Sequence, residues 1–295
     1  MSDTILVTGA SGNLGRAVIG HLLDSRGVAP GRIVAGSRNP DKLADLAARD
    51  VGVRKVDFDD PAGLERSFAG VGTLLLISTD ALDGAGTRLR QHRAAVDAAK
   101  KAGVARIAYT SLPHAETSAI SFAPDHLGTE RAIAATGLPY LFFRNSWYQE
   151  NLFMSLPQAL ETGQWYTSAG QGRTAFVARD DIAAAIAGAL ANPPAGSATW
   201  TLTGSEALTR DEIAKLAAEI LGKPIQVVHL DDEQLAGGMR AAGVPEAIVP
   251  MLVSFDTATR AGDLGTITND VATLSSRKLQ SVRGFLAASR AALLA

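Results

Sequence analysis

The first half of the chain alternates short apolar runs with longer segments that have helical periodicity. Strands that are spaced by helices need right-handed crossovers, and such strands form a parallel sheet that helices cover on both faces. The alternation therefore predicts a doubly wound parallel α/β fold of the Rossmann type. The apolar runs are residues 4–9, 32–37, 53–58, 73–78, 105–111 and 139–145.

The regular alternation ends near residue 150, and this change predicts two regions. We expect residues 1–150 to form a dinucleotide-binding domain and residues 151–295 to form a smaller α/β cap that returns strands to the main sheet. In the second region, helical and strand-like patterns are mixed with turns rich in Gly and Pro. The helical segments are residues 179–193 and 209–222, and the strand-like runs are residues 199–204 and 225–230.

Composition excludes several classes of function. The net charge of −2 argues against nucleic acid or an acidic membrane surface as the main partner. The absence of Cys excludes disulfides, thiolate nucleophiles and zinc–thiolate sites. Because we also find no targeting segment and no apolar stretch of about 20 residues, we expect a cytoplasmic protein.

A glycine-rich segment, VTGASGNLG, follows the first apolar run and opens the first helix. Glycines there allow a tight turn and let a pyrophosphate approach the N–H groups at the start of the helix. An ordinary strand-to-helix turn is the alternative, but the following alternation favours a cofactor site. The expected cofactor-binding residues of this loop are Gly9, Ala10, Ser11, Gly12, Asn13, Leu14 and Gly15.

The second apolar run ends at Ser37 and Arg38, and this end predicts the cofactor preference. An acidic side chain usually follows this strand in sites that prefer NADH, because it binds the ribose hydroxyls. Here the first carboxylate is Asp41, inside the next helix, whereas Arg38 is placed to bind a 2′-phosphate. We therefore expect NADPH as cofactor, with NADH also possible; a solvated surface arginine is the alternative.

The residues that follow the four tyrosines indicate which reactions the chain is poorly suited to catalyse. None has a Lys four residues later, so the Tyr/Lys pair that transfers protons in alcohol–ketone chemistry is absent. Its absence counts against a simple carbonyl reductase. It counts less against a quinone reductase, because a quinone becomes aromatic when it accepts hydride and depends less on a positioned acid.

Several longer segments resemble one known family. SRNPDKL, YTSLPHAETS and DHLGTERAIAATGLPYLFFRNSWYQEN resemble the NmrA-like branch of atypical short-chain dehydrogenases/reductases. Within that branch the chain is similar to the type 2 NAD(P)H:quinone oxidoreductases, and the triphenylmethane reductases share the same segments. The resemblance implies an NADPH-dependent, flavin-free reductase of quinones or similar conjugated, electron-poor acceptors.

The resemblance also implies cofactor contacts beyond the glycine loop and Arg38. They fall at the end of the fourth run and in the segment that ends the sixth. Ser146 stands where the quinone reductases carry Gly, and Pro113 is a second departure from their pattern. The residues implied are Ser78, Thr79, Phe143, Arg144, Asn145 and Ser146.

His126 is the candidate proton donor. It lies near the start of a helix, where the related isoflavone-type reductases carry a catalytic Lys, and Glu130 on the same helical face is expected to orient it. A packing or surface histidine is the alternative. Tyr109 and Asn145 complete the catalytic candidates. No histidine spacing typical of a metal site occurs, so we expect no metal.

The segment after Asn145 is the expected substrate site. Its aromatic and amide side chains suit a flat ring that carries two carbonyls, although core packing would explain some of them. The expected substrate residues are Trp147, Tyr148, Gln149 and Asn151.

Two alternatives to quinone reduction stay open. The chain could be a non-catalytic NADP(H)-sensing regulator of the NmrA type, or a reductase of dyes or other xenobiotics. The expected partner is a small molecule, and a homodimer is compatible with the sequence.

Overall fold

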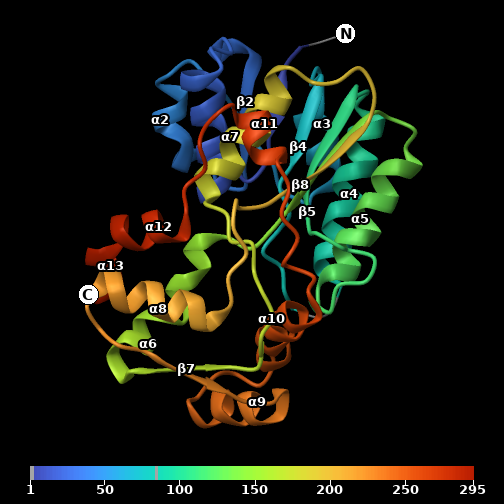
Figure 1. Cartoon of the computed structure of the whole chain (residues 1–295). Helices are drawn as coiled ribbons and strands as arrows, with labels where there is room; N and C mark the ends of the chain where they lie inside the picture. The colour runs from blue at the N-terminus through green and yellow to red at the C-terminus, as the bar shows by residue number, and fades with distance from the viewer. Residues whose placement is uncertain (1–2, 84–85) are drawn as a thin grey trace.

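The structure is a computed structural model that describes residues 3–83 and 86–295. Its main sheet has seven parallel strands in the order β3-β2-β1-β4-β5-β6-β8 (Figure 1). The order reverses between β1 and β4, which is where doubly wound folds bind their ligands. The doubly wound α/β fold predicted from the sequence is confirmed. The strands are β3 (Gly52–Lys55), β2 (Ile33–Ser37), β1 (Ile5–Val7), β4 (Thr73–Leu76), β5 (Arg106–Ser111), β6 (Tyr140–Asn145) and β8 (Ala198–Leu202).

Helices cover both faces of this sheet, and strand side chains alternate between them (Figure 1). Tyr109 and Phe142 point to the first face, whereas Ala108 and Phe143 point to the second. The first face is covered by α3 (Pro61–Phe68), α4 (Thr87–Lys101) and α5 (Ala123–Ala135). The second is covered by α1 (Asn13–Gly20), the π-helix η1 (His21–Ser25), η3 (Pro40–Leu43), α2 (Ala44–Ala47), α7 (Arg179–Ala191) and α11 (Asp270–Ser275).

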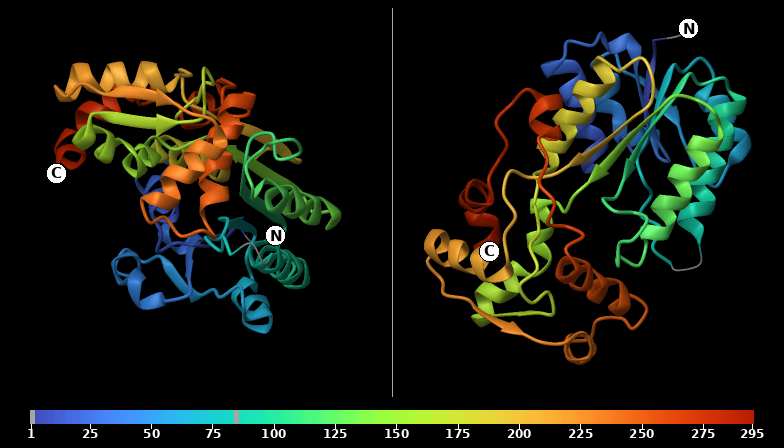
Figure 2. Two further views of the ribbon diagram at one scale, coloured as in Figure 1. Left: turned by 90° about the horizontal axis from the view of Figure 1, so that it is seen from below. Right: turned by 45° about the vertical axis from the view of Figure 1, so that its right-hand side comes forward.

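The second half of the chain contributes both to the main sheet and to a separate cap. β8 pairs with β6, and α7 and α11 pack on the second face of the sheet. The cap lies beyond the carboxyl ends of the strands and includes a small parallel sheet, in which Trp165 pairs with Val227 (Figure 2). Its elements are η4 (Gln149–Met154), α6 (Leu156–Thr162), β7 (Gln164–Thr167), α8 (Arg210–Leu221), β9 (Gln226–His229), α9 (Asp232–Ala241), α10 (Val249–Ala261), α12 (Val282–Ala288) and α13 (Arg290–Leu294).

Two small apolar clusters hold the cap together and against the sheet. One joins α6, β7, α8 and α12 around Trp165 and Phe285. The other joins the start of α5 to α10, where Phe122 and Trp147 both contact Phe255, with ring centroids 6.0 and 4.6 Å away. The cap is therefore fixed beside the carboxyl ends of β5 and β6. Among residues 3–83 and 86–295, no helix is both long and apolar enough to cross a membrane.

Candidate active site

The glycine loop connects β1 to α1 and leaves the start of that helix open. Gly9 has a φ of +60°, a conformation that side chains with a Cβ rarely adopt. At Gly15 a Cβ would lie 2.4 Å from the Gly9 carbonyl oxygen, so the third glycine is required for the close packing of helix and loop. Gly12 is the N-cap of α1, and no side chain from the described part of the chain caps the helix. The first N–H groups of α1 are therefore free to bind an anion.

Other residues of the loop fix its shape. The backbone N–H of Ala10 donates to the Gly36 carbonyl at 3.0 Å, and the Ser37 hydroxyl donates to that of Ser11 at 3.0 Å. These bonds join the loop to the end of β2. Leu14 is buried beneath the loop, whereas Asn13 is exposed beside the open helix end.

Arg38 follows β2 and extends into solvent beside this loop. Its side chain is 73% exposed, and its nearest carboxylate, Asp80, lies 3.9 Å away at the limit of an ion pair. So exposed and distant a pair contributes little, so Arg38 is free to bind a phosphate.

Four side-chain oxygens lie at the carboxyl ends of β4, β5 and β6, and we call these residues the open edge. Each oxygen is buried, yet none has a hydrogen-bond partner within the residues described. Buried polar atoms are nearly always bonded in folded proteins, so a group of unbonded ones at the edge of a sheet indicates a ligand site. The atoms are Oγ1 of Thr79, Oγ of Ser111, Oδ1 of Asn145 and Oγ of Ser146.

Three other expected cofactor residues are held by the protein itself. The backbone N–H of Ser78 donates to the Thr110 hydroxyl at 2.9 Å. Phe143 is fully buried, and its ring stacks on Trp200 with centroids 5.6 Å apart, so only its backbone can reach a cofactor. Arg144 is engaged in ion pairs, described next.

Glu130 pairs with Arg144, and this pairing corrects the expectation that Glu130 orients His126. Nε and Nη2 of Arg144 donate to the two oxygens of Glu130 at 3.0 and 2.7 Å. Nη2 also donates to Glu116 at 2.7 Å. A guanidinium binds a carboxylate with two parallel bonds more strongly than a neutral imidazole does, so Arg144 takes the carboxylate.

His126 and Tyr109 lie together on the face of the sheet that α4 and α5 cover. The Tyr109 hydroxyl is 2.9 Å from Nδ1 of His126, and Arg88 of α4 donates to Nε2 at 3.1 Å. Arginine can only donate, so Nε2 of His126 accepts and Nδ1 carries the proton. Burial, followed by the charge of Arg88, lowers the pKa of His126 well below its ordinary value. His126 is therefore a neutral imidazole with both nitrogens occupied.

His92, one helical turn after Arg88, extends this arrangement. The backbone N–H of Thr79 donates to Nε2 of His92 at 3.0 Å, so Nδ1 carries the proton and donates to the Thr129 hydroxyl at 2.9 Å. Burial, followed by the charge of Arg88, lowers the pKa of His92 to about 3. We call these residues the closed cluster: Arg88, His92, Tyr109, His126 and Thr129.

The segment after Asn145 divides between two environments. The Asn145 amide donates to the Tyr148 hydroxyl at 3.4 Å, and the Gln149 amide donates to the Gln280 carbonyl at 2.8 Å. Gln149 is fully buried and faces the C-terminal segment. Trp147 and Asn151 line a cavity of about 180 Å³ inside the cap.

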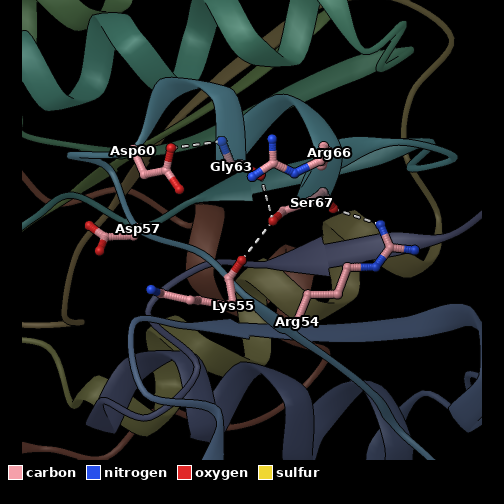
Figure 3. Close-up of a pocket in the computed structure, with 7 residues that line it drawn as sticks. All are labelled: Arg54, Lys55, Asp57, Asp60, Gly63, Arg66 and Ser67. Atoms are coloured by element: carbon pink, nitrogen blue, oxygen red, sulfur yellow. Dashed lines mark hydrogen bonds between the residues drawn. The ribbon is translucent and has the colours of Figure 1, made fainter.

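A larger cleft, of about 330 Å³, lies between β3 and α3 at the edge strand of the sheet (Figure 3). Its polar groups bond one another: Arg54 donates to the Ser67 carbonyl at 2.6 Å, and the Ser67 hydroxyl donates to the Lys55 carbonyl at 2.6 Å. Asp60 accepts from the backbone N–H of Gly63 at 2.9 Å. We do not place the active site here, because the cleft lies at the edge strand β3, two strands away from the point where the strand order reverses. No group of three or more His, Asp or Glu side chains placed to hold a metal occurs in residues 3–83 and 86–295.

The sequence did not identify Arg88, His92 or Thr129 as members of one cluster. The i, i+4 spacing of Arg88 and His92 and the i, i+3 spacing of His126 and Thr129 place each pair on one helical face. That signal was present, but only the packing of α4 against α5 shows that the two faces meet.

Comparison with known proteins identifies relatives of the chain. Quinone oxidoreductase 2 of Escherichia coli (strain K12) is 38% identical over 260 residues, which cover 88% of this chain and 89% of that protein. The crystal structure of the NADPH-dependent quinone oxidoreductase from Escherichia coli complexed with NADPH has a TM-score of 0.91 and 36% identity, and the match covers 99% of this chain and 100% of that one.

A second solved structure, the Citrobacter sp. triphenylmethane reductase complexed with NADP(H), has a TM-score of 0.89 and 35% identity, with 97% of this chain and 100% of that one covered. The family model described as NmrA-like matches residues 1–286. The resemblance predicted from the sequence is therefore confirmed, and the chain belongs to the NmrA-like family.

Proposed function

We propose that the chain is an NADPH-dependent reductase that passes hydride to quinones or similar conjugated, electron-poor acceptors, without flavin or metal. The observation that carries this proposal is the open edge, where four buried oxygens at the carboxyl ends of β4, β5 and β6 lack partners among the described residues, next to the point between β1 and β4 where the strand order reverses. The similarity to a quinone oxidoreductase complexed with NADPH supports the choice of cofactor and of acceptor.

The residues at the glycine loop fit the phosphates of NADPH. The free N–H groups at the start of α1 would bind the pyrophosphate, because the helix dipole and the donors both favour an anion. Arg38 would bind the 2′-phosphate with a charge-assisted bond from its exposed guanidinium.

The open edge fits the nicotinamide end. Thr79, Ser111, Asn145 and Ser146 offer hydroxyl and amide groups that would orient the ring and its carboxamide. When bound, the nicotinamide supplies the hydride. The protein's part is to fix the distance and orientation between that ring and the acceptor, and to exclude water from the space between them.

The proton poses a separate question, and the role of His126 as its donor stays a prediction from the sequence. We propose instead that His126 is a positioning residue. Its Nε2 accepts from Arg88 and its Nδ1 faces Tyr109, so neither nitrogen is turned to the open edge. A reduced quinone is a stable aromatic anion that takes its proton from water, and no protein acid is required.

A second candidate function is dye reduction, which the similarity to the Citrobacter sp. triphenylmethane reductase favours. Such dyes are also flat, conjugated and electron-poor, and the same hydride donor would serve. Two further proposals rest on the sequence alone: a cytoplasmic location and assembly as a homodimer.

The test is NADPH consumption with a panel of acceptors. We expect rapid oxidation of NADPH with benzoquinone and naphthoquinone, and none with a simple ketone. Gly12→Val is the matched control, because it blocks the phosphate loop and should abolish the reaction. If calorimetry shows that NADPH binds but no acceptor is reduced, the chain is a nucleotide-sensing regulator and the proposal is wrong.

A further inference from the structure

The cavity inside the cap is built around a buried arginine. It has a volume of about 180 Å³, and its apolar lining includes Trp147, Trp165, Phe176, Leu252 and Phe255. This volume is below the roughly 300–1,000 Å³ of sites for drug-sized molecules, so it suits one small ring system. Flat aromatic walls favour a flat aromatic ligand.

Arg210, the first residue of α8, lines this cavity and is only 8% exposed. Its Nη2 pairs with Asp256 of α10 at 3.3 Å. Asp256 is held independently by the Thr167 hydroxyl at 2.7 Å and the Ser168 N–H at 2.8 Å. The charge of Arg210 is therefore balanced within the cap, and the pair does not need an anion.

The hydrogen bonds of this guanidinium are nevertheless incomplete. Nη1 of Arg210 is buried and has no hydrogen-bond partner within the described part of the chain. The guanidinium carbon lies 5.6 Å from the ring centroids of both Trp165 and Phe176, which hold the group in place by cation–π contacts. A buried N–H without an acceptor is unfavourable, so an unpaired donor on a residue that lines the cavity indicates a ligand oxygen there.

We propose that this cavity is a subsite for an oxygen-bearing aromatic ring of the acceptor, and that Nη1 of Arg210 donates to that oxygen. The inference rests on the proposed reductase function and adds to it a specificity-determining residue. Because Asp256 already balances the charge, the subsite takes a neutral carbonyl or hydroxyl oxygen in preference to a carboxylate or sulfonate. Trp147 connects the subsite to the open edge, since it directly follows Ser146.

The first test compares Arg210→Lys with the wild type in steady-state kinetics. Lysine keeps the ion pair with Asp256 but loses the second N–H group of the fork. We expect KM for 1,4-naphthoquinone to rise about fivefold to tenfold, with kcat and the affinity for NADPH unchanged. Arg173→Lys is the matched control. Arg173 is an exposed arginine that pairs with Glu212 of α8, the helix that Arg210 begins, and its substitution should change none of these values.

Two further acceptors sharpen the test. A cationic triphenylmethane dye without oxygen atoms should be reduced equally well by wild type and Arg210→Lys. A naphthoquinone sulfonate should bind less well than the neutral quinone. An unchanged KM for naphthoquinone in the variant, or tighter binding of the sulfonate, overturns the proposal.

A binding measurement separates this proposal from the function on which it rests. Two of the three tryptophans, Trp147 and Trp165, line the cavity, whereas Trp200 lies against Phe143 in the core. Naphthoquinone should quench tryptophan fluorescence saturably in the wild type without NADPH, and Arg210→Lys should weaken this binding about fivefold. If the wild type oxidises no NADPH, the proposed function fails, but the quenching experiment still tests whether naphthoquinone binds at the subsite. Quenching that does not saturate, or that is equal in the two proteins, overturns the subsite.

Discussion

The open edge and the closed cluster lie in the same fold and are both built from buried polar side chains, but the side-chain oxygens of the open edge differ from the ring nitrogens of the closed cluster in their hydrogen bonding. In the open edge, Asn145 and Ser146 keep side-chain oxygens without partners among the residues described. In the closed cluster, both ring nitrogens of His92 and of His126 are bonded. Thr79 of the open edge connects the two regions, since its N–H donates to His92 of the closed cluster while its hydroxyl has no partner among the residues described.

This difference separates groups that act on a ligand from groups that hold the site in place. Residue type alone points the other way, because a histidine beside a tyrosine is a typical acid–base pair. The partners of each atom show that the pair is already occupied within the protein. The bond from Thr79 to His92 then gives the closed cluster its role, which is to fix the end of β4 relative to α4 and α5.

The largest effect should come from lowering the pH, which acts on the closed cluster. The pKa of His92 is about 3 in the folded protein and that of His126 is lowered well below the ordinary 6.5. A histidine with a lowered folded pKa contributes stability that is complete above pH 6.5 and is lost as the pH falls toward the folded value. At about 1.4 kcal/mol per pH unit, His92 alone should cost about 2 kcal/mol of unfolding free energy at pH 5, and His126 adds a loss of the same sign.

Urea unfolding at pH 7 and pH 5 measures this loss. His126→Gln should lose less stability between the two pH values than the wild type, because one titrating group is gone. Equal losses in the two proteins would show that His126 is not held neutral.

The next effect concerns the ligand site, at the glycine loop. Gly12→Val should weaken NADPH binding at least about a hundredfold, or 3 kcal/mol, because a branched side chain blocks the approach of the pyrophosphate. The backbone there is extended, with φ −87° and ψ 168°, which valine can adopt, although its Cβ would lie 3.3 Å from the Gly9 carbonyl oxygen. Calorimetry gives the affinity, and thermal unfolding checks that the fold is kept. Unchanged affinity would mean that the loop is not the phosphate site.

A smaller effect should follow from Arg38→Ala. Loss of one charge-assisted contact should weaken NADPH binding by about 1.5–3 kcal/mol and leave NADH binding nearly unchanged. Arg49→Ala is a matched control, since Arg49 is also an exposed arginine but pairs with Asp24. If titrations show that Arg38→Ala loses equal affinity for NADPH and NADH, Arg38 does not bind the 2′-phosphate.

Local signals in the sequence were sufficient for the main sheet and for the glycine loop. The alternation of apolar runs and helices and the positions of Gly9 and Gly15 follow from short-range rules of turn and helix geometry. Short elements were harder. The helix expected around Asp41 is a 3₁₀ turn, η3, followed by the four residues of α2. β7, also four residues long, carries too few positions for a period-two pattern to be read.

The candidate site was predictable only where chain neighbours form it. Asn145 ends β6 and Ser146 directly follows it, so their place at the open edge is determined by the strand itself. Arg88 and His126 are 38 residues apart and meet only because α4 packs on α5. The sequence places Arg210 only at the start of a helix. Its place beside a cavity depends on its pairing with Asp256, which lies in another helix, α10, 46 residues later in the chain.

The central claim is that the open edge does the work on the ligand while the closed cluster supports it, and one paired measurement tests it. The measurement is kcat/KM for naphthoquinone at saturating NADPH, beside the unfolding free energy, in Asn145→Ala and His126→Gln. We expect Asn145→Ala to lower kcat/KM about tenfold to a hundredfold with little loss of stability. We expect His126→Gln to lower stability by about 1–3 kcal/mol and to leave kcat/KM within about threefold of the wild type. A stable His126→Gln protein that has lost about 10²-fold or more in kcat/KM, as removal of a general acid would cause, would contradict it.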